Sequence, residues 1–377
     1  MDGSSRSSSE YPKAARTISK IISQLPHLHS VVLEQVVLTV DFRRALFASA
    51  SLRSLGLHHV DVSPLRAEKT ASKITHLTIS NVVTRDTLHN LVSDLSHSLE
   101  SIELGAEVYS LLAKFYGGTF PKLTRLIVHP SEGANPTLLA KLLVATPTLT
   151  TLSLPTTSVL PEVPATALPR LSDLTGPAAS VLSLVKSRPI RSLRILDREK
   201  SPTTFGDIKA ILSYCPDLAR LELPNQFPDL STLCYRLEAL AALPCGAALV
   251  HLAIHVDVRA DDAVRAHEGP LAPDAVRVLS RAFPLVDSSQ FGPLWRGRAV
   301  GFPRLESLQV RIATGALLSA RYCRLWTASN VLPLCHRLRG VEYTAYKDGT
   351  HSTPVDKIRY WRVVGGPWET SVRESSS

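Results

Sequence analysis

The chain has 377 residues, of which 44% are hydrophobic and 6% aromatic, and it carries a formal net charge of +9 at pH 7. This positive excess is spread along the sequence without a dense basic stripe, so no nucleic-acid-binding surface is expected. No stretch reaches the ~18 consecutive apolar residues of a membrane span, and the serine-rich residues 1–10 lack the apolar run of a signal peptide. Five cysteines without C-x-x-C spacing indicate reduced thiols, so we expect a protein of the cytoplasm or nucleus.

A hydrophobic pattern of the form L-x-x-L-x-L, in which other aliphatic residues can replace leucine, recurs twelve times along the chain. One copy is LRSLGL at residues 52–57, and most copies start 19–28 residues after the previous one. The first residues of the copies are Leu28, Leu52, Ile74, Leu99, Leu123, Leu149, Leu171, Ile190, Leu218, Leu249, Leu305 and Leu338. This period is typical of a leucine-rich-repeat solenoid. We therefore predict an α/β fold of about 12 irregular strand–helix repeats with a parallel, concave sheet.

Helices are expected between the strand motifs, because apolar residues recur there at i, i+3, i+4 and i+7. Residues 138–143 and 208–215 are examples. A proline two residues before the first leucine of several repeats should end the preceding helix. Residues 155–170 contain four prolines, so we expect a loop in place of a helix, and Gly176 occupies an apolar position of the next motif.

The predicted organisation is one long repeat domain between two end segments. Residues 1–24 are expected to be a capping or disordered segment, residues 25–345 the repeats, and residues 346–377 a C-terminal cap with a disordered tail. A cap is expected because an end repeat cannot bury its own apolar face; residues 358–364 are its predicted strand. Residues 257–303 form an insertion, which is either a binding element or an ordinary surface loop.

The polar residues between the strand leucines should point to the concave face, because side chains alternate along a strand. This set has both signs of charge and is rich in arginine and histidine toward the C-terminal half. Arginine is common at the energetic centres of protein interfaces. We therefore predict a protein partner on the concave face, at Arg194, Arg220, Glu222, His251, His255 and Arg311. The alternative is a solvated face without a ligand. The double replacement of Arg220 and Arg311 by Glu is expected to abolish binding without unfolding the chain.

No catalytic motif is found: the sequence has no P-loop, no G-x-S-x-G, no H-E-x-x-H and no G-x-G-x-x-G. The best metal candidate is HLAIHVD at residues 251–257, with His336 or His351 as a further ligand. Two histidines four residues apart on an extended strand stand ~13 Å apart, too far for one ion. We predict no catalytic residue, no metal site and no cofactor.

The form x-Pro-x-Leu-x-x-Leu-x-Leu, as in FPKLTRLIV at residues 120–128 and CPDLARLEL at residues 215–223, resembles F-box-type leucine-rich-repeat proteins. The irregular repeat lengths are most similar to the large, divergent fungal sets. The resemblance implies repeats that hold a substrate, while an N-terminal F-box docks the Skp adaptor of a cullin-RING ubiquitin ligase. No F-box is recognised here, since Leu25-Pro26 belongs to the first repeat and about 24 residues precede it. A truncated chain, a shortened paralogue and a plain scaffold all stay open.

The function expected from these patterns is that of a non-catalytic protein-binding scaffold. Its more specific form is the substrate-recognition part of an F-box-type ubiquitin ligase receptor, with the Skp adaptor and cullin as partners. The alternative is a leucine-rich-repeat regulator of an enzyme, such as a GTPase-activating protein.

Overall fold

The computed structural model describes residues 17, 20–22, 24–62, 72–81, 91–105, 120–129, 136–155, 160–198, 202–227, 236–237, 239–257, 301–313, 335, 337–346, 354–361 and 369–373. The chain forms two compact units, residues 1–188 and residues 189–377. Their boundary falls inside the predicted repeat domain, between the repeat that opens at Leu171 and the repeat that opens at Ile190.

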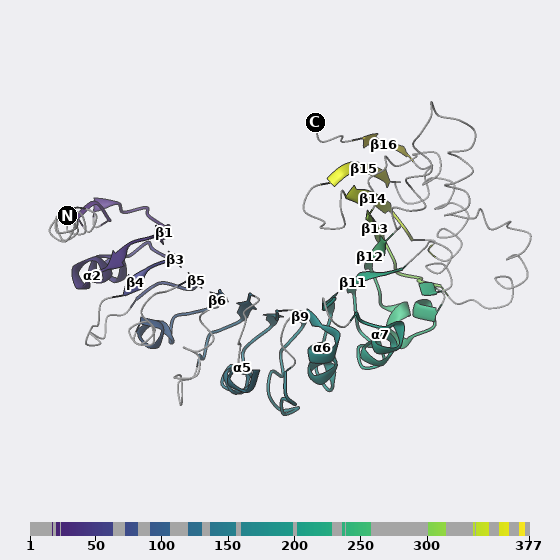
Figure 1. Cartoon of the computed structure of the whole chain (residues 1–377), viewed down its shortest axis with the longest axis horizontal. Helices are drawn as coiled ribbons and strands as arrows, with labels where there is room; N and C mark the ends of the chain where they lie inside the picture. Colours follow the sequence, from purple (N-terminus) through teal and green to yellow (C-terminus); the bar gives the residue numbers. More distant parts are fainter. Residues whose placement is uncertain are drawn as a thin grey trace, which may run out of the picture. The chain divides into compact units, whose positions relative to one another are not determined.

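The first unit contains seven parallel strands, each paired with the next. In sheet order they are β1 (Ser30–Glu34), β3 (Ser54–His58), β5 (His76–Ser80), β6 (Ser101–Leu104), β7 (Arg125–Val128), β8 (Thr151–Ser153) and β9 (Asp173–Pro177). A small second sheet pairs β2 (Val37–Leu38) with β4 (Asp61–Val62). Helices with assigned bounds are α2 (Val40–Ala48), α5 (Pro136–Val144) and α6 (Ala178–Val185), and residues 91–95 are helical as well. Helices α5 and α6 lie on the same side of the strands (Figure 1).

The second unit continues the same strand pattern and ends in an antiparallel cap. Its parallel strands are β10 (Ser192–Leu196), β11 (Arg220–Phe227), β12 (His251–Asp257), β13 (Ser307–Ala313) and β14 (Gly340–Tyr346). Strands β15 (Pro354–Trp361) and β16 (Glu369–Arg373) follow in antiparallel pairing. Between these strands lie α7 (Phe205–Leu212) and the short 3₁₀ helix η2 (Pro244–Ala247).

The twelve sequence motifs coincide with the twelve parallel strands. Each strand begins two residues after the first aliphatic residue of its motif, as β3 does after Leu52. The apolar positions of the motif face the core, and Leu52, Leu55 and Leu57 are fully buried. In most repeats one carbonyl accepts two N–H groups of the next repeat: Glu100 O accepts from Thr124 N at 2.8 Å and from Arg125 N at 3.0 Å. The prediction of a parallel α/β solenoid is confirmed.

The predicted irregular repeat around residues 155–170 is confirmed as a loop in its described part, residues 160–170, which contains no helix. The buried guanidinium of Arg188 holds this loop by donating from Nε to Ala167 O at 3.0 Å and from Nη2 to Pro164 O at 2.8 Å. Gly176 is buried in β9, where a Cβ atom would stand 3.2 Å from Leu154 Cβ. The motif that contains Gly176 is therefore a true repeat.

The predicted helices at 138–143 and 208–215 correspond to α5 and α7. Strand β15 begins four residues before the predicted capping strand at 358–364, and β16 lies in the segment expected to be a disordered tail. The repeat pattern does not predict β16, because an antiparallel cap does not follow the leucine period. Most of the predicted insertion, residues 258–300, lies outside the described residues.

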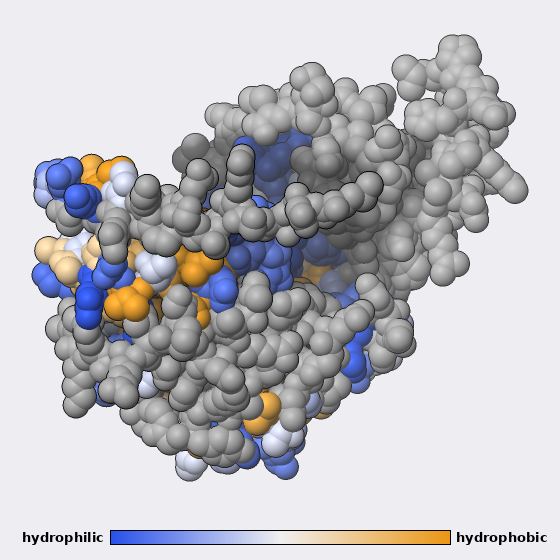
Figure 2. Space-filling model, turned by 60° about the vertical axis from the view of Figure 1, so that its left-hand side comes forward, coloured by the Kyte–Doolittle hydropathy of each residue, from blue (hydrophilic) through white to orange (hydrophobic). Residues whose placement is uncertain are grey.

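In the first unit, the sheet face opposite the buried leucines carries mainly small and hydroxyl side chains. One row across the strands consists of Ser30, Ser54, His76, Ser101, Arg125, Thr151 and Asp173. Val32 is 63% exposed on β1. Figure 2 shows hydrophobic side chains among hydrophilic ones on the side of the molecule that carries the first repeats.

Candidate functional site

Polar side chains form rows across the second unit, on the sheet face that points away from the buried leucines. Because the strands pair in parallel register, equivalent positions of successive repeats lie side by side. The first row holds Ser192, Arg220, His251 and Ser307; the second holds Arg194, Glu222, Ala253, Gln309 and Glu342; the third holds His255, Arg311 and Thr344. We call the surface formed by these three rows the polar face.

Glu222 is the centre of an ion-pair network on the polar face. Its Oε1 atom lies 2.6 Å from Arg311 Nη1, 3.3 Å from Arg194 Nε and 3.5 Å from His255 Nε2. Burial alone would raise the pKa of Glu222, but the hydrogen bond from His255 and the charges of Arg194 and Arg311 outweigh burial and lower this pKa to about 2. The carboxylate is therefore ionised at every pH near neutrality.

Arg311 uses most of its hydrogen-bonding capacity inside the protein. In addition to its bond with Glu222, its Nη2 donates to Gln309 Oε1 at 3.0 Å, and its Nη1 lies 3.2 Å from His255 Nε2. Its side chain is 20% exposed, and its buried Nε has no hydrogen-bond partner in the described part of the chain. Arg311 therefore holds the network together, and its predicted contact with a partner stays a prediction.

His255 is buried, at 7% exposure, although the alternation of side chains places it on the exposed side of β12. The difference arises because Glu222 and Arg311, from the two neighbouring strands, both contact its imidazole. The tautomer of His255 decides the contact: Nε2 donates to Glu222 when protonated and accepts from Arg311 when not. His255 therefore has little exposed surface of its own, and its predicted contact with a partner stays a prediction.

Glu342 is a second centre, joined to the first through Gln309. The Glu342 carboxylate accepts hydrogen bonds from Gln309 Nε2 at 2.7 Å and from Arg359 Nε at 2.8 Å, and it lies 3.2 Å from Lys357 Nζ. Burial raises the pKa of Glu342, but the hydrogen bonds from Arg359, Gln309 and Lys357 outweigh it, so the pKa is lowered. One connected polar network thus extends from Arg194 on β10 to Arg359 on β15.

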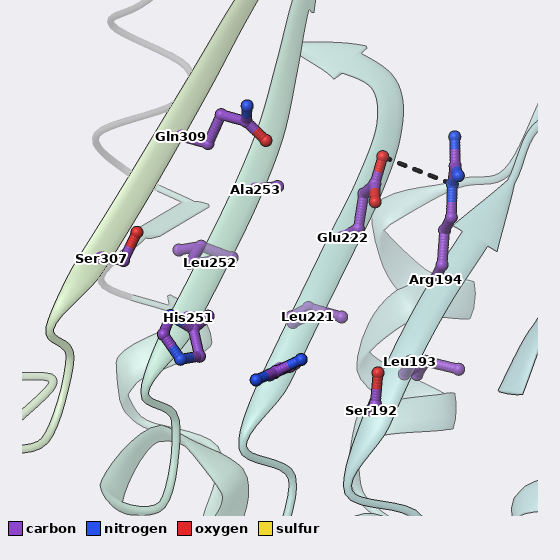
Figure 3. A pocket seen from close by; sticks show the side chains of 11 residues that line it. Ser192, Leu193, Arg194, Leu221, Glu222, His251, Leu252, Ala253, Ser307 and Gln309 are labelled. Atoms are coloured by element: carbon purple, nitrogen blue, oxygen red, sulfur yellow. Dashed lines mark ion pairs between the residues drawn. The ribbon is translucent and has the colours of Figure 1, made fainter. Parts of the chain in front are cut away.

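A cavity of about 220 Å³ opens on the polar face, over strands β10 to β13. Figure 3 shows Arg194 and Glu222 pointing toward each other from neighbouring strands at its edge. Arg220 also lines the cavity; it is exposed and makes no ion pair with any described residue. Burial, together with the charge of Arg220, lowers the pKa of His251 against the opposing effect of Glu306, so this imidazole is mainly neutral at pH 7.

The structure brings the six predicted site residues together, in two groups. Arg194, Arg220, Glu222 and His251 line the cavity, whereas Arg311 and His255 lie in the network behind Glu222. The sequence prediction of the site omits Gln309, Glu342, Lys357 and Arg359. The first two occupy outward positions of recognised motifs, so the repeat pattern could have included them. Lys357 and Arg359 come from the antiparallel strand β15, for which the repeat pattern carries no signal.

Among the described residues, no three histidine, cysteine or acidic side chains come together in a way that could hold a metal ion. None of the described helices has the length and apolar character needed to cross a membrane. A scan against models of known protein families finds no match, and a search of curated proteins finds no relative.

Proposed function

We propose that the chain is a non-catalytic scaffold that binds a protein partner through the polar face of β10 to β13. The observation that supports this proposal is the arrangement of Arg194 and Arg220. Both arginines are exposed at one cavity, and Arg194 is held there by the partly buried Glu222. A side chain that is already positioned loses less conformational entropy when a partner binds, which favours affinity.

The more specific form of this proposal is that the repeats are the substrate-recognition part of an F-box-type ubiquitin ligase receptor. The x-Pro-x-Leu-x-x-Leu-x-Leu form of the repeats supports it. In that case the Skp adaptor and a cullin are additional partners. We place the protein in the cytoplasm or nucleus, supported by three free, buried thiols, Cys215, Cys245 and Cys335.

The test is quantitative affinity-purification mass spectrometry of the tagged chain from its native cells. The variant to compare with the unchanged chain carries both Arg194→Gln and Arg220→Gln, because neither arginine belongs to the interior of the network. The Arg220→Glu and Arg311→Glu pair is unsuitable, since a carboxylate at position 311 would face Glu222 in a partly buried site and destabilise the fold. Arg125→Gln is the matched control, because Arg125 holds the same repeat position on β7 as Arg220 on β11.

We expect the unchanged chain and the Arg125→Gln variant to capture the same polypeptide in stoichiometric amount. The Arg194→Gln, Arg220→Gln variant should lose it. Recovery of the Skp adaptor and cullin with all three chains would support the ligase form of the proposal. Equal capture by the double variant would contradict the placement of the partner on the polar face.

A further inference from the structure

We propose that the polar face recognises an acidic, extended segment of the partner, whose side-chain carboxylates bind between Arg194 and Arg220. This inference rests on the proposed function and specifies the chemistry of the partner. The charge balance of the polar face, the unused donors of the two arginines and the size of the cavity support it.

The charges on the described part of this face do not balance. On the polar face and the neighbouring strand β15, five cationic side chains surround two carboxylates, those of Glu222 and Glu342: Arg194, Arg220, Arg311, Lys357 and Arg359. The carboxylate of Glu306 beside His251 is paired with Arg339, so this pair leaves the balance unchanged. These five cations and two carboxylates give a balance of +3. The pKa values of Glu222 and Glu342 are both lowered, so the two carboxylates stay ionised between pH 6 and 8. A surface with such an excess attracts a negatively charged segment and repels a basic one.

The unused donors lie on the two arginines at the cavity. Arg194 uses Nε for Glu222, its side chain is 51% exposed, and its terminal amino groups make no hydrogen bond to any described residue. Arg220 stands one row away on the neighbouring strand, which puts the two Cα atoms about 8 Å apart, from the strand spacing and rise. Guanidinium groups at this separation can donate to one carboxylate or to two successive ones.

The size of the cavity favours a side chain over a small-molecule ligand. Its volume of about 220 Å³ is below the ~300 Å³ at which sites for drug-sized ligands begin. Ser307 at the same cavity is uncharged and the imidazole of His251 is mainly neutral, so neither adds a negative charge beside that of Glu222 that would repel a carboxylate. An extended segment fits best, because its alternate side chains point to one side and match the spacing of the rows.

Glu222 acts as an internal competitor in this arrangement. Its carboxylate already pairs with the Nε of Arg194, as a carboxylate of the partner would pair with this guanidinium. Replacing Glu222 by Gln raises the balance from +3 to +4, while the amide Oε1 can still accept from Arg194 Nε and keep that guanidinium in position. A unit charge removed about 6 Å from the bound carboxylate changes affinity by about threefold in water, so the Glu222→Gln variant should bind an acidic segment about threefold more tightly.

The probe is a fluorescein-labelled peptide of alternating Glu and Ser, titrated with the full chain and followed by fluorescence anisotropy. The comparison probes are the same peptide with Gln in place of Glu, the same peptide with phosphoserine in place of Glu, and a single-stranded DNA oligonucleotide. We expect the Glu peptide to bind most tightly and to weaken when salt rises from ~0.05 to ~0.15 M. Arg194→Gln and Arg220→Gln should each weaken binding about tenfold, and Arg125→Gln by less than about twofold.

Several outcomes would overturn the inference. These are no binding of the Glu peptide at low salt, equal binding of the Gln peptide, tighter binding of the phosphoserine peptide or of the oligonucleotide, and a Glu222→Gln variant that folds but binds no more tightly. The capture experiment decides the proposed function separately. A partner that is lost with Arg194 and Arg220, and that contacts them through a segment without acidic residues, would leave the scaffold function standing and remove this inference alone.

Discussion

Replacing Glu222 by Gln should lower the free energy of unfolding of the second unit by about 3 kcal/mol at pH 7. The pKa of this carboxyl is about 2 in the folded chain against an ordinary value of 4.5. Each pKa unit corresponds to ~1.4 kcal/mol, so the folded surroundings favour the carboxylate over its neutral form by about 3 kcal/mol. Glutamine keeps the size of the side chain but removes the charge, and Arg311 then loses the counter-charge that lies 2.6 Å from its Nη1.

The pH dependence of this effect has a definite sign. Because the folded pKa of Glu222 lies below the unfolded one, its stabilisation is fully present above pH 4.5 and is lost as the pH falls toward 2. At pH 3.5, one unit below the unfolded pKa, about 1.4 kcal/mol has been lost. The difference between the unchanged chain and the Glu222→Gln variant should therefore be about 1.4 kcal/mol smaller at pH 3.5 than at pH 6.

Urea unfolding followed by tryptophan fluorescence measures this difference in the relevant unit, because all four tryptophans lie between residues 295 and 368. The matched control is Glu306→Gln. Glu306 is 38% exposed, and its partner Arg339 lies 4.0 Å away and is 57% exposed, so the loss should stay below about 1 kcal/mol. A Glu222→Gln effect no larger than that of the control at pH 7, or an effect equal at pH 6 and pH 3.5, would refute the reasoning.

Three further predictions concern packing and thiol chemistry. Arg188→Met should lower the free energy of unfolding by about 3 kcal/mol or more, because it leaves carbonyls of the loop and of α6 without a donor. Urea unfolding followed by circular dichroism measures this, and no loss would contradict the role of the guanidinium. Gly246→Ala should lower the melting temperature, because its Cβ would collide with the backbone of Ala241. Gly206→Ala on α7 has room for the Cβ and should raise the melting temperature slightly. The opposite order of melting temperatures would exclude this packing. Burial raises the thiol pKa to about 12 for Cys215, about 11 for Cys245 and about 12 for Cys335. These thiols should therefore resist alkylation by iodoacetamide at pH 8 until urea unfolds the chain. Mass spectrometry of the alkylated protein measures this, and modification without urea would contradict it.

The positions of the parallel strands follow from the sequence alone. A strand that packs on a core needs an aliphatic side chain at every second position, and a solenoid repeats this need once per turn. The motif starting at Leu171 shows how strong the signal is, because β9 forms there despite Gly176. The same periodicity places Arg194, Arg220 and Glu222 on one face, since residues at equivalent repeat positions become neighbours in a parallel sheet.

Which of these side chains pair with one another was decided by the tertiary structure. Glu222 and Arg311 are 89 residues apart in the chain and two strands apart in the sheet, and no repeat pattern states that their side chains meet. The burial of His255 depends on that meeting. Lys357 and Arg359 reach Glu342 from β15, an antiparallel strand outside the repeats. A repeat pattern determines which side of the sheet a residue faces, because that depends only on alternation along the strand. Ion pairing and burial depend on the side chains that the neighbouring strands bring within contact distance, and these are known only once the chain has folded.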